Sequence, residues 1–414
     1  MTGSAEFRYE ELPAAVDALR ILIVKPCTSF DDDIECSLET KLFSNRPRYI
    51  ALSYTWQDYD AALAPIESAR TENSVGGHEN IATNDPAILL NQFPFNVQRN
   101  LYRALKHLRS LEHPLNLWVD AICINQNDIN ERNKQVTMMT FIYQNARRVV
   151  GWLGIDVNRE DQWKNGNSRN LAKLINGSED IPYSGEPDGE TVDRIMTNQY
   201  WSRLWIVQEV CTPQHLLFVR GSNIWRYENV ESWSGVRRCL ETDSHSRGRN
   251  DDSRSHFIRL ITTRGKRHSD EMRLERLIER FVSNGCAETR DRVYGFLGLA
   301  NDVNSASSAG GEADPDELDD LRLQLGDRWQ HRNINRARVN IKVDYDMPLY
   351  HIWVSVVKHL LFTATPVNNP ALRIDPDRRI DERLLSLVRS AGIVQAAFDQ
   401  KIEEELKTRV PRAS

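Results

Sequence analysis

An acidic residue inside an aromatic segment is the first candidate for chemistry in this sequence. In the segment WSRLWIVQE, helical i, i+3, i+4, i+7 spacing relates Trp201, Leu204, Trp205 and Gln208. Glu209 follows Trp205 by four residues, so a helix would place its carboxylate beside an indole. A carboxylate held against aromatic surface can stabilise positive charge or transfer protons. The alternative is a structural glutamate, partly buried and paired with the backbone or an arginine.

The elements that would position this carboxylate alternate between strands and helices. Strands are predicted for residues 48–56, 115–120 and 147–154, and helices for 96–111 and 128–146. The second helix has a capping-box start, with Asp128 followed three residues later by Glu131. This order predicts a parallel sheet covered by helices, whose ligands bind beyond the carboxyl ends of the strands. The residues expected at such ends are Ser53, Tyr54, Trp56, Asp120 and Cys123.

The rest of the chain divides into an N-terminal segment, an insertion and a C-terminal part. A strand at 17–25 is expected to pair at the edge of the core sheet, and short strands are expected in an excursion at 57–94. The predicted organisation is an N-terminal strand segment at 1–48, a core at 49–230 with an insertion at about 155–195, and a mostly helical extension at 231–414. Further strands are expected at 216–221 and 339–345, helices at 271–281, 349–361 and 382–406, and a loop at 301–320.

Composition narrows the class of protein. With 414 residues, 40% hydrophobic and 27% charged, the chain is expected to be a soluble globular protein of more than one packed unit. Neither a membrane span nor a signal peptide is apparent, which predicts a cytoplasmic protein. The formal net charge of −6 argues against general nucleic-acid binding. The six cysteines are scattered without a C-x-x-C pair, so neither a disulfide framework nor a zinc site is expected.

Several common kinds of enzyme site are missing from the sequence. There is no G-x-G-x-x-G motif and no G-x-x-x-x-G-K-[ST] motif, which argues against a Rossmann dehydrogenase and a P-loop NTPase. No histidine pair has metal-ligand spacing, so we expect neither a metal nor a bound cofactor.

Three separated blocks resemble the core of the fungal heterokaryon-incompatibility (HET) domain. They read YIALSYTW at residues 49–56, LWVDAICINQ at 117–126 and RLWIVQE at 203–209. Two later blocks, TRDRVYGFLGL at 289–299 and VDYD at 343–346, are similar to segments common downstream in such proteins. One departure is Gln57, where the family usually has glycine.

The resemblance implies a fold and a biological role. HET domains are associated with the cell-death reaction that follows fusion of incompatible fungal cells, and they are regarded as distant relatives of TIR domains, many of which cleave NAD. The expected fold is therefore α/β, a TIR-like (flavodoxin-like) parallel sheet flanked by helices. The pair Ser53-Tyr54 is similar to the end of the first TIR strand, and Asp120 to the acid that often ends the second. The segment from Ser202 to Glu209 resembles, with one added residue, the helix that carries the catalytic glutamate of plant-type TIR domains.

This resemblance makes Glu209 the predicted catalytic residue of an NAD glycohydrolase. Cleavage of the nicotinamide–ribose bond passes through an oxocarbenium-like state that one carboxylate can stabilise. Aromatic side chains would pack on the nucleotide rings, polar ones would bond ribose or phosphate, and an arginine would pair with the pyrophosphate. The predicted substrate-binding residues are Ser53, Tyr54, Trp56, Asp120, Cys123, Asn125, Gln126, Arg132, Arg203, Trp205 and Gln208.

Each of these residues also has a structural interpretation. Ser53 and Asn125 can satisfy turn backbone, and Asp120 can cap the segment that follows it. Trp56 and Trp118 can belong to the core, Cys123 can be a small buried residue, and Arg203 can pair with a structural acid such as Asp120.

Three functions therefore remain open. The first is a cell-death effector that hydrolyses NAD or a related nucleotide. The second is a non-enzymatic signalling or assembly module, and the third is a nucleotide sensor without turnover. By analogy with TIR domains the protein is expected to form a homo-oligomer, with an upstream incompatibility or NLR-type protein as a possible partner.

Overall fold

The computed structural model describes residues 6–13, 17–56, 85–155, 183–243, 252–269, 271–303 and 341–349, and positions 351, 352, 355, 356 and 359. The chain divides into two compact units built from interleaved segments. The first, here called the sheet unit, comprises Met1–Asn125, Asn145–Trp201 and Pro213–Ile258. The second, the helical unit, comprises Gln126–Gln144, Ser202–Thr212 and Arg259–Ser414. These units are defined by contacts in space. They do not test the predicted division of the sequence at residues 48 and 230, which stays a prediction.

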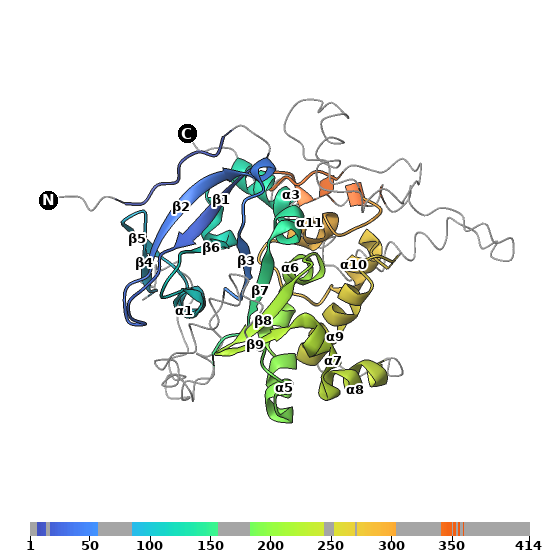
Figure 1. Cartoon of the computed structure of the whole chain (residues 1–414). Coiled ribbons are helices and arrows are strands. Elements are labelled where there is room, and N and C mark those ends of the chain that lie inside the picture. Colours follow the sequence, from blue (N-terminus) through green and yellow to red (C-terminus); the bar gives the residue numbers. More distant parts are fainter. Residues whose placement is uncertain are drawn as a thin grey trace, which may run out of the picture. The chain divides into compact units, whose positions relative to one another are not determined.

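All strands of the described residues belong to one sheet within the sheet unit. The strand order is β5-β4-β2-β1-β6-β3-β7-β8-β9 (Figure 1). The strands are β1 (Ala18–Val24), β2 (Glu35–Leu42), β3 (Ile50–Ser53), β4 (Ala87–Leu90), β5 (Phe93–Asn96), β6 (Leu115–Trp118), β7 (Arg148–Trp152), β8 (Leu216–Arg220) and β9 (Asn223–Arg226).

The middle of the sheet is the parallel group that the sequence predicts. β3 pairs in parallel with both β6 and β7, and β7 pairs in parallel with β8. These strands are short and almost wholly buried, as expected where helices cover both faces of a parallel sheet. Across the sheet these strands lie in the order β6-β3-β7-β8, although β3 is the first of them in the chain and β6 the second. The order in which the chain adds strands therefore reverses between β3 and β7. The strands predicted at 48–56, 115–120, 147–154 and 216–221 are confirmed.

The N-terminal strand extends the parallel group rather than ending the sheet. β1 is antiparallel to β6, the outer strand of that group, and is also antiparallel to β2. Beyond β2 lie β4 and β5, which form a short hairpin. The strand predicted at 17–25 and the short strands predicted before residue 94 are thus present, while residues 57–84 of that excursion lie outside the described residues.

Helices of the sheet unit follow the apolar periodicity of their sequences. In α1 (Arg99–Leu108), the apolar side chains of Leu101, Ala104, Leu105 and Leu108 are buried on one side. The other helical elements of this unit are η1 (Phe43–Asn45), α2 (Asp120–Cys123), α5 (Gly189–Met196), α7 (Tyr227–Ser232) and α8 (Ser234–Asp243). Two further elements, η4 (Gln199–Ser202) and α9 (Asp252–Gly265), have residues in both units.

The helical unit is built from α3 (Ile129–Asn145), α6 (Ile206–Cys211), α10 (Leu274–Arg280) and α11 (Asp291–Leu297). The predicted cap of α3 is present, because the Asp128 side chain accepts a hydrogen bond from the Glu131 amide at 3.1 Å. Gly298 permits close packing against α3, since a Cβ there would lie within contact distance of Thr140. Among the described residues, no helix combines the length and apolar character needed to cross a membrane.

One predicted strand of the helical unit is wrong. Residues 341–347 form no strand, although Ile341, Val343 and Tyr345 alternate and are buried as a strand pattern requires. Their backbone is held by side chains instead of a neighbouring strand. The Tyr294 hydroxyl donates to the Asp344 carbonyl at 2.8 Å, and the Tyr345 amide donates to the Asn133 side chain at 3.0 Å. The predicted insertion at 156–182, most of the loop at 301–320 and the helix at 382–406 lie outside the described residues.

Candidate functional site

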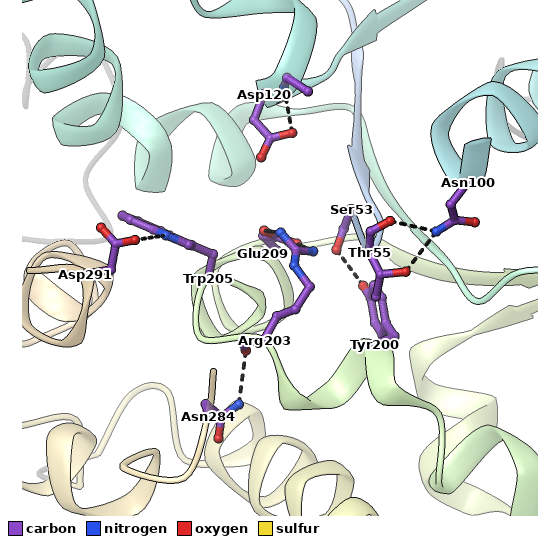
Figure 2. A network of polar contacts seen from close by, with 11 residues as sticks. Ser53, Thr55, Asn100, Asp120, Tyr200, Arg203, Trp205, Glu209, Asn284 and Asp291 are labelled. Atoms are coloured by element: carbon purple, nitrogen blue, oxygen red, sulfur yellow. Dashed lines mark hydrogen bonds and ion pairs between the residues drawn. The ribbon is translucent and has the colours of Figure 1, made fainter. Parts of the chain in front are cut away.

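The carboxyl ends of β3 and β7 meet in the sheet unit at the point where the strand order reverses. Ser53, the last residue of β3, is the register partner of Gly151 in β7. The Tyr200 hydroxyl lies 2.6 Å from the Ser53 hydroxyl (Figure 2). A Cβ on Gly151 would stand 2.6 Å from that tyrosine oxygen, so only glycine allows Tyr200 to lie this close. Ser53 is 1% exposed and Tyr200 is fully buried. Tyr200 therefore covers the serine that the sequence predicts to bind substrate.

A second set of polar bonds lies at the same end of the sheet unit. The Asn100 side-chain amide donates to both the carbonyl and the hydroxyl of Thr55 at 2.8 Å, and its oxygen accepts from the Trp152 indole at 3.0 Å. All three residues are buried. We call Ser53, Thr55, Asn100, Trp152 and Tyr200 the hydroxyl–amide cluster. Sequence reasoning missed Asn100 and Tyr200, whose partners are distant in the chain.

The aromatic residues predicted near this end have different surroundings. Tyr54 is buried, with 2% of its surface exposed, and Trp118 is fully buried. Trp56 is instead 40% exposed. The core interpretation is thus confirmed for Trp118 and wrong for Trp56, which follows β3 after the strand has left the sheet. Of these three side chains, Trp56 is the one that a ligand can reach directly.

Asp120 and Cys123 lie at the two ends of the short helix α2. The Asp120 carboxylate accepts a hydrogen bond from the Ala121 amide at 2.8 Å, as in its capping interpretation. Cys123 is fully buried, and burial raises the pKa of its thiol to about 12. The interpretation of Cys123 as a small buried residue is therefore confirmed. Asn125 ends the first segment of the sheet unit, Gln126 begins the helical unit, and both residues are partly exposed.

Glu209 belongs to the helical unit and is buried against an arginine. Its carboxylate is 1% exposed, and the two terminal nitrogens of Arg203 lie 3.3 Å and 3.5 Å from its two oxygens (Figure 2). The Arg203 side chain keeps 21% of its surface exposed. Arg203 thus pairs with a buried acid, and that acid is Glu209. A buried carboxylate beside a partly exposed cation is suited to stabilising a transient positive charge.

The helix predicted across residues 201–209 is interrupted. η4 ends at Ser202 and α6 begins at Ile206, so Trp201 and Gln208 do not share one helix. Between them the backbone pairs with Gly285: its amide donates to the Ser202 carbonyl at 2.7 Å, and its carbonyl accepts from the Leu204 amide at 2.9 Å. The Asn284 side chain also donates to the Arg203 carbonyl at 3.0 Å (Figure 2). Backbone pairing to a distant segment thus replaces the helical bonds that local periodicity predicts.

The Trp205 indole is bonded to a residue that sequence reasoning did not select. Its nitrogen donates to the Asp291 carboxylate at 3.0 Å (Figure 2). The other oxygen of Asp291 accepts from the Tyr345 hydroxyl at 2.5 Å. The Arg132 guanidinium lies over the Tyr345 ring, 4.1 Å from its centroid. We call Trp205, Asp291, Tyr345 and Arg132 the acid–aromatic cluster. The signal that could have found Asp291 and Tyr345 is their position in the blocks at 289–299 and 343–346.

Gln208 has a structural role in the helical unit. Its amide donates to the Gly295 carbonyl at 2.9 Å, and its oxygen accepts from the Thr140 hydroxyl at 3.2 Å. The side chain thereby joins α6 to α11 and α3 and is 1% exposed. Direct contact between Gln208 and a substrate is therefore not supported. No group of acidic, histidine or cysteine side chains suited to a metal ion occurs in the described part of the chain.

Comparison with known proteins shows which protein family part of this sequence resembles. Residues 49–209 match the family described as heterokaryon incompatibility protein (HET). These residues are therefore similar to a HET domain. The match begins with the β3 block and ends at Glu209, as the resemblance of the three sequence blocks predicts. Asp291 and Tyr345 lie outside the residues that match this family.

A curated relative carries the comparison further along the chain. Heterokaryon incompatibility protein 6, OR allele, from Neurospora crassa is 30% identical over 339 residues, covering 69% of this chain and 48% of the relative. The chain thus spans about half the length of this relative. No solved structure matches the chain.

Proposed function

We propose that this protein acts in fungal heterokaryon incompatibility and that it does so by hydrolysing NAD at the nicotinamide–ribose bond. The family of the HET domain and the Neurospora relative support the first part. The observation that carries the second is the buried Glu209 carboxylate with the partly exposed Arg203 beside it. The site is proposed to work in the cytoplasm without a metal or bound cofactor.

One carboxylate is enough for this reaction. The bond between the ribose carbon and the nicotinamide nitrogen breaks, its electron pair stays on the nitrogen, and nicotinamide leaves as a neutral molecule. The ribose carbon develops positive charge, which the Glu209 carboxylate stabilises because its low exposure weakens solvent screening. Water then attacks that carbon and loses a proton, giving ADP-ribose. No separate general acid is required.

Arg203 gives the substrate a way to reach the buried carboxylate. Since Glu209 is 1% exposed, a ribose can contact it only after neighbouring side chains move. Arg203 is the partly exposed partner, and its contacts of 3.3 Å and 3.5 Å are long for a charge-assisted bond. We infer that Arg203 turns from Glu209 to the pyrophosphate when NAD binds, which frees the carboxylate for the ribose.

Two other residues of the helical unit fit the same substrate. Arg132 is a second guanidinium, stacked on Tyr345, and its buried Nε atom has no hydrogen-bond partner among the residues that the structure describes. The Arg132 guanidinium is planar and carries several N–H donors, so it can bond a phosphate oxygen. Trp205 is partly exposed at the start of α6 and offers aromatic surface for a nucleotide ring.

The strand order supports the proposed relation to TIR domains. The parallel group β6-β3-β7-β8 reads second, first, third, fourth, which is the order of flavodoxin-like doubly wound sheets. The antiparallel strand β9 follows β8, where such a sheet would have its fifth strand. We propose on this basis that the HET domain has a TIR-like core, enlarged by β1, β2, β4 and β5.

A non-enzymatic assembly module is the second candidate function. The observation that favours it is the burial of four residues that were predicted to contact the substrate: Ser53, Tyr54, Cys123 and Gln208. In this alternative the Glu209–Arg203 pair fixes the start of α6, and the protein acts through self-association or through an upstream incompatibility protein. A nucleotide sensor would bind NAD with the same residues and release no product.

Nicotinamide release from NAD by the purified chain distinguishes these functions. Glu209→Gln keeps the size of the side chain and its ability to bond Arg203, and Glu279→Gln, an exposed change on α10, is the matched control. We expect Glu209→Gln to lower kcat by about a thousandfold, the upper range for removing one electrostatic stabiliser of a transition state. The control should retain full activity.

The remaining outcomes separate the alternatives. Equal release by wild type and Glu209→Gln would keep the enzyme and remove Glu209 as its catalyst. NAD binding without product, measured by calorimetry, would favour the sensor. Concentration-dependent assembly without NAD binding, measured by light scattering, would favour the assembly module.

A further inference from the structure

Asp291 lies where two aromatic side chains of the helical unit converge. It is the first residue of α11 and is 7% exposed. One of its oxygens accepts from the Tyr345 hydroxyl at 2.5 Å, and the other accepts from the Trp205 indole at 3.0 Å. An indole nitrogen can only donate, so at least one oxygen of Asp291 must act as an acceptor. With both donors turned towards it, the carboxylate is bonded in the way an ionised acid requires.

The contact continues from Asp291 to an arginine. The Tyr345 amide is held by the Asn133 side chain at 3.0 Å, so the backbone that carries the ring is fixed to α3. Arg132, one residue earlier on α3, lies over that ring at 4.1 Å. Asp291 therefore orients Trp205 through one oxygen and, through the other, the ring on which Arg132 stacks.

We propose that Asp291 is a positioning residue which, in its ionised form, holds Trp205 and Arg132 in the arrangement that meets the nucleotide. This inference rests on the proposed function, because its catalytic consequence appears only if NAD is the substrate. Asp291 itself need not touch NAD. It lies outside residues 49–209, so the inference assigns part of the site to the chain that follows the HET domain.

Protonation of Asp291 would disturb this arrangement. The pKa of Asp291 is raised to about 6, chiefly by burial. The nearby Glu288 carboxylate acts in the same direction, while the hydrogen bonds from Tyr345 and Trp205 and the charge of Arg132 oppose the rise. Once protonated, the carboxyl becomes a donor at one oxygen, and the Tyr345 hydroxyl must turn to accept or lose its bond. The positioned state is thus expected to form as the pH rises through about 6.

The indole N–H signal of Trp205 tests the contact without any enzyme assay. The protein is labelled with indole-¹⁵N tryptophan, and Trp205→Phe assigns the resonance. We expect the Trp205 signal of wild type to titrate with a midpoint near 6. Asp291→Asn should abolish that titration, whereas Asp346→Asn, an exposed change in the same region, should leave it intact. A Trp205 signal that does not titrate in wild type, or that titrates unchanged in Asp291→Asn, would overturn the proposal.

The pH profile of nicotinamide release tests the consequence for catalysis. For wild type and the Asp346→Asn control, kcat/KM should rise as the pH increases through about 6. Asp291→Asn should lose this rise and fall by about a hundredfold, as expected when a site is misplaced by roughly an ångström. Tyr345→Phe keeps the ring under Arg132 and removes the bond to Asp291, so it tests the contact in a variant whose core packing is preserved.

The failures of the two proposals can be told apart. If no variant, wild type included, releases nicotinamide, the proposed reaction is wrong, and the indole titration alone then decides whether Asp291 positions Trp205. If wild type is active and Asp291→Asn has the same pH profile, the proposed reaction stands and the positioning role is wrong.

Discussion

The hydroxyl–amide cluster of the sheet unit and the acid–aromatic cluster of the helical unit differ in charge. In the first, all side chains are neutral and buried: Ser53 bonds Tyr200 at 2.6 Å, and Asn100 bonds Thr55 at 2.8 Å and Trp152 at 3.0 Å. The second contains the buried acid Asp291 with the partly exposed Arg132, and the same helical unit holds the buried Glu209 with the partly exposed Arg203. Burying a carboxylate opposes folding far more than burying a bonded hydroxyl.

This difference indicates which cluster fixes shape and which is suited to chemistry. A neutral network with its bonds made stabilises one packing of strand ends and leaves no charge for a reaction. A buried acid next to a partly exposed cation is costly to maintain and provides a reactive group. The predictions that follow contrast the two clusters, beginning with the largest expected effect.

Removing one charge should destabilise the protein more than removing one hydroxyl. We expect Glu209→Ala to lower the free energy of unfolding by about 3 to 5 kcal/mol, because Arg203 loses its buried partner. Ser53→Ala should lower it by about 1 to 2 kcal/mol, the effect of one buried hydrogen bond. Urea unfolding of both variants measures the difference. Equal losses would mean that the ion pair is screened by solvent and that the charge contrast is unimportant.

The acid–aromatic cluster should also make stability depend on pH. The folded-state pKa of Asp291 is raised from 3.8 to about 6, so the folded state binds this proton more tightly than the unfolded state. Its contribution is fully present below about pH 4 and is lost as the pH rises through 6. Relative to Asp291→Asn, wild type should lose about 3 kcal/mol across this window, from roughly 1.4 kcal/mol per pKa unit.

Urea unfolding of the two proteins between pH 4 and 7 measures this loss, and other titrating groups cancel in the difference. A difference that does not change with pH would show that Asp291 is not desolvated. The expected sign also means that the ionised form, which positions Trp205, is the less stable one. Stability is then given up for an arrangement useful in binding.

Local sequence patterns were sufficient to predict the central strands, but they did not predict where distant segments of the chain pair with each other. The strands β3, β6, β7 and β8 were predictable, because alternating or continuous apolar runs define a buried strand without knowledge of its neighbours. The helix expected over 201–209 was wrong, because Gly285 takes the backbone bonds of Ser202 and Leu204. Such pairing between distant segments leaves no periodic signal.

The candidate site shows the same limit. Glu209 and Arg203 were both selected from one segment of the sequence, and these two residues, six positions apart, form an ion pair. The bond from Trp205 to Asp291 spans 86 positions, and the bond from Tyr345 to Asp291 spans 54. Only the resemblance of their blocks to other sequences pointed to these residues, and it gave them no role. The groups that set the pKa of an acid thus depend on the tertiary structure, even when the acid itself can be identified from the sequence.

The hydroxyl–amide cluster can be tested by filling the space that glycine leaves. In Gly151→Ala the new Cβ would lie 2.6 Å from the Tyr200 oxygen and 2.8 Å from the Phe218 ring, so both must shift. We expect a loss of about 1 to 3 kcal/mol in the free energy of unfolding. Gly189→Ala is the matched control, since its Cβ would meet nothing within 4 Å. Tyr200→Phe removes the clashing oxygen, so it should destabilise the Gly151→Ala protein less than wild type. Additive effects would show that the hydroxyl does not lie over Gly151.

The smallest expected change in stability concerns two neighbours after β3. Trp56 is 40% exposed, so Trp56→Ala should change the free energy of unfolding by no more than about 0.5 kcal/mol. Tyr54 is 2% exposed, and Tyr54→Ala should lower it by about 3 to 5 kcal/mol, as for other large buried rings. If Trp56 packs on a ring of NAD, its removal should nevertheless raise KM about tenfold or more, since stacking on an aromatic side chain contributes about 1 to 3 kcal/mol. A stable variant with unchanged KM would remove Trp56 from the substrate contacts. Trp56 and Tyr54 are close in the sequence, so their positions alone do not distinguish their roles. Their difference in burial indicates which of the two can affect binding without affecting folding.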